Sequence, residues 1–407
     1  MVIIISELIL IMLIARNLRN KGLHSIYRYL CLAFLVQAFI LIVYRLELAS
    51  IGRNVYYSDA EVYWNATLSL LYGNPVRTWN MGYVYYCYII QITSPFIWVG
   101  FINISNILLI DITILIFSYL MVNSQVPMKN AQFFILVCTL NPLIIYALGR
   151  NLKDVLFLFY TMLTLVIFHW LKTKRTKRIT RGVLYCLIVI LAVLLTDVRP
   201  WGFLVSIAAL FASVSEVLAY HFRKSPVRFG VTCIFIMVSL PPIAILMKQR
   251  GFLSHLDLWI PIVLENARSQ SWSRLLLAPM RILTGPGPLR SVLGNEYFLF
   301  YTVSGNVFSA IGAFMWWIVL GILVANLLVG NKQLNHLSKM LLLIFGLFMM
   351  IYSMQYGGSL ELRFRGIVYI LTSGLVLSLV PRRSDNRVRS LAIIMMFVIF
   401  AGGLWFS

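Results

Sequence analysis

The sequence predicts an all-α protein that crosses a membrane about twelve times, as a single transmembrane domain over residues 1–407. Hydrophobic residues make up 61% of the chain and charged residues only 12%, whereas a soluble domain contains about 45–50% and about 25%. Many apolar segments approach or reach the roughly 20 residues that cross a bilayer. Basic residues gather in the short loops between these segments, as the positive-inside rule describes.

The formal net charge of +21 comes from 34 Lys and Arg residues against 13 Asp and Glu residues. In a soluble protein such a surplus would indicate a nucleic-acid partner, but here the loop positions explain it, so no nucleic-acid binding is expected. The predicted cytoplasmic loops contain Arg16–Arg28, residues 172–178, Arg223–Arg228, Lys332–Lys339 and residues 382–389.

The first predicted span, Val2–Ala15, leads into a basic loop, and the second, Tyr29–Tyr44, crosses outward. An outer loop over residues 45–82 follows, which contains an acidic pair and aromatic residues typical of the membrane–water interface. The later predicted spans are 155–171, 183–198, 202–222, 230–247, 299–327, 340–355, 366–381 and 390–406.

Residues 83–148 contain three apolar pieces, at about 83–100, 102–121 and 131–148. Both ends of this region must lie outside, which requires an even number of crossings. The first piece, rich in tyrosine and interrupted by Pro95, is therefore expected to lie at the interface or to re-enter.

The long outer loop, residues 248–297, mixes apolar residues with Arg268, Arg274 and Arg281. This mixture indicates amphipathic helices at the membrane interface. The TGPGP run at 284–288 is expected to end the helical character, because proline lacks an N–H donor and glycine frees the backbone.

Charged side chains at the outer ends of the spans are the candidates for chemistry, because such residues are costly near the membrane and usually face a cavity or one another. The acidic pair is Asp59 and Glu61. Arginine suits a phosphate ligand because its planar fork donates two parallel hydrogen bonds. The candidate substrate-binding residues are Arg150, Lys153, Asp154, Asp197, Arg199, Arg281, Arg363 and Arg365.

Structural roles compete with these assignments. Arg150, Lys153 and Asp154 could form only a charge cluster at a helix end, where Asp154 complements the helix dipole. Asp197 and Arg199 could form a mutual ion pair across a turn, and the residues near 363–365 could be interfacial side chains that reach toward water. For the acidic pair, solvated loop residues are the alternative to the favoured catalytic or substrate-binding role.

In their order along the chain, the motifs around these residues resemble those of the GT-C-type membrane glycosyltransferases, specifically bacterial relatives of the protein O-mannosyltransferase superfamily. The matching stretches cover most of the chain: Asp59-Ala60-Glu61, GNPVRTWNMGYVYY, NPLIIYALGRNLKDVLFLF, DVRPWG, TGPGP and RFRG. An additional span before the acidic loop departs from the family pattern, and no C-terminal soluble domain is expected.

The resemblance implies inverting transfer of a sugar from a polyprenyl-phosphate carrier to an acceptor glycan or lipid, in the assembly of cell-surface polysaccharide such as O-antigen. It implies a multi-pass protein of the bacterial inner membrane with its site on the outer, periplasmic side. Asp59 would act as general base and Glu61 would assist it, or the two would bind Mg²⁺ or Mn²⁺ in members that use a divalent cation. Arg363 and Arg365 would hold the carrier phosphate.

Two other functions remain open at this point. An O-antigen or exopolysaccharide polymerase would have a similar architecture and would depend more on the outer arginines than on the acidic pair. A polysaccharide flippase or other transporter is expected to contain internal repeats and broken helices at mid-depth, and the sequence has no convincing repeat.

Overall fold

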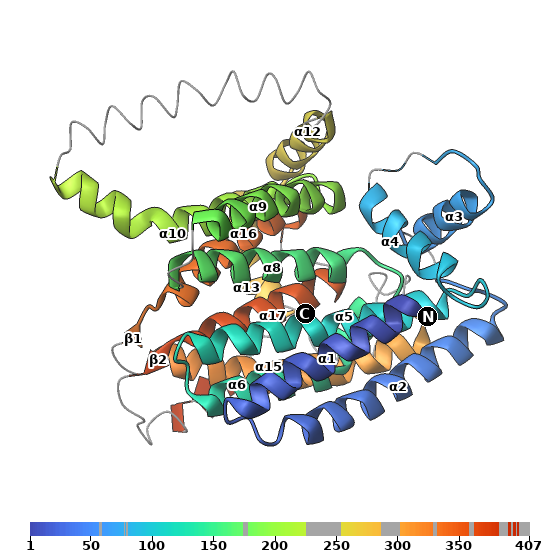
Figure 1. The fold of residues 1–407 in the computed structure, drawn as a ribbon, viewed down its shortest axis with the longest axis horizontal. Helices are drawn as coiled ribbons and strands as arrows, with labels where there is room; N and C mark the ends of the chain where they lie inside the picture. Colours follow the sequence, from blue (N-terminus) through green and yellow to red (C-terminus); the bar gives the residue numbers. More distant parts are fainter. Residues whose placement is uncertain are drawn as a thin grey trace.

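The computed structural model describes residues 1–56, 59–76, 78, 80–173, 178–224, 254–285, 302–328, 332–357 and 362–381, with short pieces between 390 and 398. Over these residues the protein is a helical bundle, apart from one antiparallel pair of two-residue strands, β1 (Lys332–Gln333) and β2 (Val380–Pro381). Figure 1 shows the long helices lying side by side, with shorter helices at their ends.

Within the described residues, six helices are long and apolar enough to cross a membrane. They are α2 (Ile26–Ser50), α5 (Gly100–Asn123), α8 (Asp154–Thr173), α9 (Arg178–Val198), α15 (Val303–Leu328) and α16 (His336–Tyr356). The pair α6 (Met128–Leu140) and α7 (Pro142–Gly149) would together make a seventh, bent by 58°. These helices confirm the prediction of a multi-pass helical membrane protein.

Other helices complete the described part of the chain. The ones that run with the bundle are α1 (Val2–Asn20), α10 (Phe203–Lys224) and α17 (Leu362–Ser378). The shorter ones are α3 (Asp59–Leu71), α4 (Met81–Ile92), α12 (Ser254–Arg268) and α13 (Trp272–Thr284). The predicted span at 230–247 and most of the span at 390–406 lie outside the described residues.

One boundary differs from the predictions, and one short helix agrees with them. Helix α2 continues to Ser50, so the first six residues of the loop assigned to 45–82 are helical; Arg45 and Glu47 did not end an otherwise apolar helix. Helix α4, in the piece expected to lie at the interface or to re-enter, has only 12 residues. These span about 18 Å at 1.5 Å per residue and cannot cross a hydrocarbon core of about 30 Å.

The bend between α6 and α7 has a local cause in the sequence. Pro142 has no N–H and cannot continue the hydrogen-bond pattern of α6. Asn141 begins the next helix: its side-chain oxygen accepts from the backbone N–H of Leu143 at 2.9 Å, and its amide donates to the carbonyl of Gly312 on α15 at 3.1 Å. A Cβ at Gly312 would overlap Asn141 and Leu143, so the bend depends on this glycine.

Contacts between distant segments define two ends of the bundle. At one end, which we call the basic end, Lys21 donates to Asn123, and Asn130 donates to the carbonyl of Leu377 at 3.0 Å. At the other, the site end, Glu47 accepts from the backbone N–H of Val303 at 2.7 Å. Described parts of the predicted outer loops meet at the site end, where Arg363 on α17 contacts Asp154 at the start of α8, and Arg365 contacts the end of α13.

Candidate functional site

Asp59 begins α3, where a carboxylate complements the helix dipole. Consecutive residues of a helix are about 100° apart, so Asp59 and Glu61 leave α3 on opposite sides. The Asp59 side chain is 41% exposed and faces the bundle, whereas Glu61 is exposed. The structure therefore does not bring the acidic pair together, and of the two residues only Asp59 belongs to the site.

Arg363, on the first turn of α17, connects Asp59 to the bundle. Its Nη1 donates to Asp59 Oδ2 at 2.6 Å, and its Nε lies 3.8 Å from Asp154 Oδ2. The first contact joins residues 304 positions apart in the chain. Burial raises the pKa of Asp59, but Arg363 and then Lys153 lower it, and the net shift is downward. Asp59 is therefore a carboxylate at neutral pH.

Asp154 is the fully buried centre of the site and forms an ion pair with Arg199. Arg199 directly follows α9 and lies over three aromatic rings, with its Cζ 5.5 Å from the centroid of Phe157, 5.9 Å from Trp201 and 4.8 Å from Phe364. Burial alone would lower the pKa of Arg199, but Asp154 outweighs it and the net shift is upward. The pair therefore forms the inner part of the site.

Lys153 adds a third cation. Its Nζ lies 5.8 Å from the ring centroid of Tyr63, one turn after Asp59 on α3. Burial, and then Arg199, lower the pKa of Lys153 to about 7, against the opposite influence of Asp154 and Asp59. Lys153 is therefore half-protonated near neutral pH.

We call the five residues Asp59, Lys153, Asp154, Arg199 and Arg363 the charge cluster. It contains three cationic and two anionic side chains, so its net charge is +1 when Lys153 is protonated and zero when Lys153 is neutral. In the ion pairs of the cluster, the side chains of Asp154, Arg199 and Arg363 are buried, whereas that of Asp59 is 41% exposed. An anion that enters from the Asp59 side would meet Arg363 and Lys153 first.

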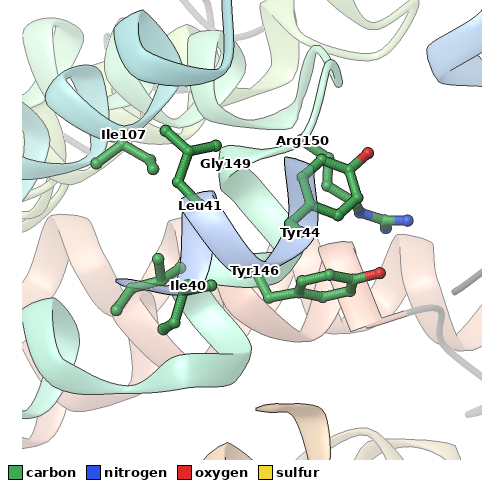
Figure 2. A pocket seen from close by; sticks show the side chains of 8 residues that line it. Ile40, Leu41, Tyr44, Ile107, Tyr146, Gly149 and Arg150 are labelled. Atoms are coloured by element: carbon green, nitrogen blue, oxygen red, sulfur yellow. The ribbon is translucent and has the colours of Figure 1, made fainter. Parts of the chain in front are cut away.

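Asp197 and Arg150 do not belong to these ion pairs. The carboxylate of Asp197 lies against Gly82 of α4, where a Cβ would overlap it, and Arg199 pairs with Asp154 instead. Buried Arg150 lies over the ring of Tyr146 at 5.2 Å. Figure 2 shows Arg150 and Tyr44 beside a small recess whose other lining residues are mostly apolar.

Arg365 serves a different part of the structure from Arg363, because the two are about 200° apart around α17. Its Nη1 donates to the carbonyls of Arg281 at 3.1 Å and Ile282 at 3.0 Å, and also to that of Gly285. Tyr369 donates to Gly285 as well, at 2.8 Å. Arg365 thus donates to carbonyls at the end of α13, of which that of Arg281 also accepts from the backbone N–H of Gly285 at 3.0 Å, and Arg281 takes part through its backbone.

Two tryptophans of α15 complete this anchor. The indole Nε1 atoms of Trp316 and Trp317 donate to the carbonyls of Leu283 and Thr284, each at 2.7 Å. At the other end of α13 the apolar side chains are exposed: Trp272 is 82% and Leu276 77% exposed. An amphipathic helix with one end inserted among α15 and α17 agrees with the expected helices of the long loop.

The donor set of the site does not fit a resident divalent cation. Within the described ranges, no three His, Cys, Asp or Glu side chains gather as metal ligands. Asp59 and Glu61 leave α3 on opposite sides, and Arg363 contacts both Asp59 and Asp154. Where Mg²⁺ or Mn²⁺ would need oxygen ligands, this part of the site contains a guanidinium group.

Buried polar residues that hold the site were not among the candidates from sequence. Asn106 of α5 donates to the carbonyl of Arg150 at 2.6 Å and to the hydroxyl of Tyr83 at 3.1 Å, and Asn103 donates to the carbonyl of Gly149 at 3.1 Å. Two asparagines three residues apart in an otherwise apolar segment share one helix face. That spacing was the sequence signal from which these buried polar residues could have been found.

No protein-family model, curated protein or solved structure matches the chain.

Proposed function

We propose that the chain is an integral-membrane glycosyltransferase that moves a sugar from a polyprenyl-phosphate carrier to an acceptor glycan or lipid. The contact between Asp59 and Arg363 at 2.6 Å carries this proposal, because it joins a carboxylate to a phosphate-binding group from the other end of the chain. A transfer from a lipid phosphate needs both groups in one place: one to take a proton and one to stabilise the leaving phosphate.

The proposed reaction is a direct displacement at the anomeric carbon. The acceptor hydroxyl oxygen forms a bond to this carbon while the bond from the carbon to the phosphate oxygen breaks, which inverts the configuration. The electron pair of the broken bond stays on the carrier phosphate, next to Arg363 and Lys153. The hydroxyl proton passes to the carboxylate of Asp59. General-base catalysis of this kind contributes about 10²–10⁴-fold.

The ion pair of Asp59 with Arg363 in the free protein explains why the donor should bind before Asp59 takes up a proton. Arg363 neutralises Asp59 and keeps its pKa low, so Asp59 is a weak base before the donor binds. A carrier phosphate competes for Arg363, and Asp59 then loses its strongest cationic partner while it stays partly buried. Its pKa rises and the carboxylate becomes a better base when the reactive phosphate is present.

The Arg199–Asp154 pair has a supporting role in this mechanism. Arg199 is enclosed by aromatic rings and Asp154 is fully buried, so neither can reach a ligand directly. Asp154 orients Arg363 from behind through its Oδ2. The mechanism uses no metal ion, in keeping with the donor set.

The proposal includes the wider setting expected from the sequence: about twelve crossings in a GT-C-like arrangement, in the bacterial inner membrane, with the charge cluster at the periplasmic face. The basic residues at the opposite end of the bundle support this orientation. The exposed apolar face of α13, with Trp272 and Leu276, would face the lipid in which the carrier is dissolved.

A transporter is a second candidate, and the bent pair α6–α7 favours it. Broken helices are typical of transporters, which place their substrate sites at the break near mid-depth. In this chain the break is closed by contacts of Asn141 with α7 and α15, and the charge cluster lies at the helix ends instead.

Mass spectrometry of surface glycans separates the candidates. Cells that lack the chain are complemented with the native protein, with Asp59→Asn or with Glu61→Gln as the matched control on the same helix turn. Glycosyl transfer predicts that one sugar modification disappears with Asp59→Asn and persists with Glu61→Gln, at equal amounts of inserted protein. Loss of chain length alone would indicate a polymerase, and precursor retained inside would indicate transport.

A further inference from the structure

Asn151 connects two of the four segments that supply the charge cluster. Its side chain is 1% exposed. The amide nitrogen donates to the carbonyl of Ala60, next to Asp59, at 3.0 Å, and the amide oxygen accepts from the hydroxyl of Tyr83 at 2.9 Å. Asn151 itself lies two residues before Lys153, so one buried side chain joins the start of α3 to the turn before α8.

The other side of this connection is fixed to α5. Asn106 donates one amide hydrogen to the Tyr83 hydroxyl and the other to the carbonyl of Arg150. The Tyr83 hydroxyl in turn donates a hydrogen bond to the side-chain oxygen of Asn151. The hydrogen bonds thus run in one direction from α5 through α4 to α3. Buried hydrogen bonds are stronger than exposed ones, so this series of bonds ties α3 to α5 through α4.

The hairpin of α3 and α4 packs on the long helices through α4, which contacts α5 and α9. Figure 1 shows it at one end of the bundle, beside the long helices. The first turn of α3 reaches the bundle through the ion pair of Asp59 with Arg363 and the bond of Ala60 with Asn151. When a phosphate takes Arg363 away from Asp59, the bond from Asn151 to Ala60 still holds that turn.

We propose that Asn151 is the positioning residue that fixes the carboxylate of Asp59 relative to Lys153 and Arg363. The proposal rests on the proposed function, in which Asp59 acts as the base. A displacement of about 1 Å in such a site costs on the order of 10²-fold in rate. Loss of the Asn151 bond should therefore lower kcat by about that factor and leave KM for the donor nearly unchanged.

The test combines hydrogen exchange with kinetics. The variants are Asn151→Ala, the milder Tyr83→Phe, which removes only the hydroxyl that orients Asn151, and Asn130→Ala. Asn130 also donates a long-range amide hydrogen to a backbone carbonyl, at 3.0 Å, but at the basic end. Exchange in a peptide from the first half of α3 should become faster with Asn151→Ala and Tyr83→Phe, and should not change with Asn130→Ala.

The kinetic arm separates positioning from general stability. Residues that act through one another give non-additive effects, so Asn151→Ala should lower kcat in the native background and have no further effect in an Asp59→Asn background. An additive loss, or unchanged exchange of α3 in both Asn151→Ala and Tyr83→Phe, would overturn the positioning role. Full activity of Asp59→Asn would instead overturn the proposed function, and the exchange data would still decide whether Asn151 holds α3.

Discussion

Lys153 should make the affinity of the site for an anion depend on pH in a defined direction. In the free protein its pKa is about 7, because burial and Arg199 both disfavour the charged form. A phosphodiester with one negative charge at about 4 Å interacts with the ammonium group by about 4 kcal/mol at an effective dielectric constant of about 20. Since one pKa unit corresponds to about 1.4 kcal/mol, the bound complex should have a Lys153 pKa near 10.

The two pKa values define the pH window. Below about pH 7 Lys153 is protonated with and without ligand, so this residue gives no pH dependence. Between about pH 7 and pH 10 binding must take up a proton, and affinity should fall about tenfold per pH unit, or roughly 10³-fold in all. Above about pH 10 both forms are neutral and the dependence ends.

Methyl geranylgeranyl phosphate is a suitable probe because a phosphodiester keeps one negative charge over this range. Its affinity for the detergent-purified protein would be measured from pH 6 to pH 10 by calorimetry, in two buffers of different ionisation enthalpy so that proton uptake is counted directly. The Lys153→Arg variant, which stays charged, should bind with little pH dependence. The reasoning is refuted if the native protein binds equally at pH 7 and pH 9, or if Lys153→Arg shows the same fall.

Three further substitutions test the packing around the site. Asp154→Asn leaves buried Arg199 without its counterion and should lower the free energy of unfolding by about 3–5 kcal/mol. Adding Arg199→Met should recover most of this loss. Thermal unfolding in detergent measures both variants, and a single variant as stable as the native protein would argue against the buried pair. Arg365→Ala removes donors from the last carbonyls of α13 and should destabilise that end by about 1–3 kcal/mol, seen as faster proteolysis there; unchanged protection would contradict the anchor. Gly312→Ala should lower the free energy of unfolding by about 1–3 kcal/mol through overpacking. Gly346→Ala, with no atom within 4 Å of the new Cβ, should leave it unchanged. Equal melting temperatures of the two variants would refute the close packing at the bend.

The sequence was sufficient to predict which residues reach the site end. Span hydrophobicity and the basic loops place Asp59, Lys153, Arg199 and Arg363 at the same end, and the structure brings them together. The 12-residue α4 and the helices of the long loop also follow from residue pattern, since tyrosine, proline and alternating arginine limit what those segments can form.

The pairing inside the site could not be predicted from the same pattern. Asp197 is two residues from Arg199, yet Arg199 pairs with Asp154, because the end of α9 turns the two side chains to different neighbours. Arg363 and Arg365 likewise diverge around α17. Such choices depend on which helices are adjacent, and adjacency between distant segments leaves no mark in the local sequence.

The role of Asn151 could not be predicted from the local sequence either. A single asparagine in a polar turn is usually a solvated residue, and nothing in the run GRNLKD distinguishes it from Arg150 or Lys153. Its importance comes from Ala60 and Tyr83, which approach it from other helices. The asparagines at 103 and 106 were the better signal, because polar side chains on one face of an apolar helix need partners.

An electron cryomicroscopy map of the protein with methyl geranylgeranyl phosphate would test most directly whether distant cations and Asp59 share one anion site. We expect phosphate density within hydrogen-bond distance of Arg363, near the ammonium group of Lys153, and Asp59 released from Arg363 but still beside Asn151. Phosphate density away from Arg363, with the ion pair of Arg363 and Asp59 intact, would contradict the account.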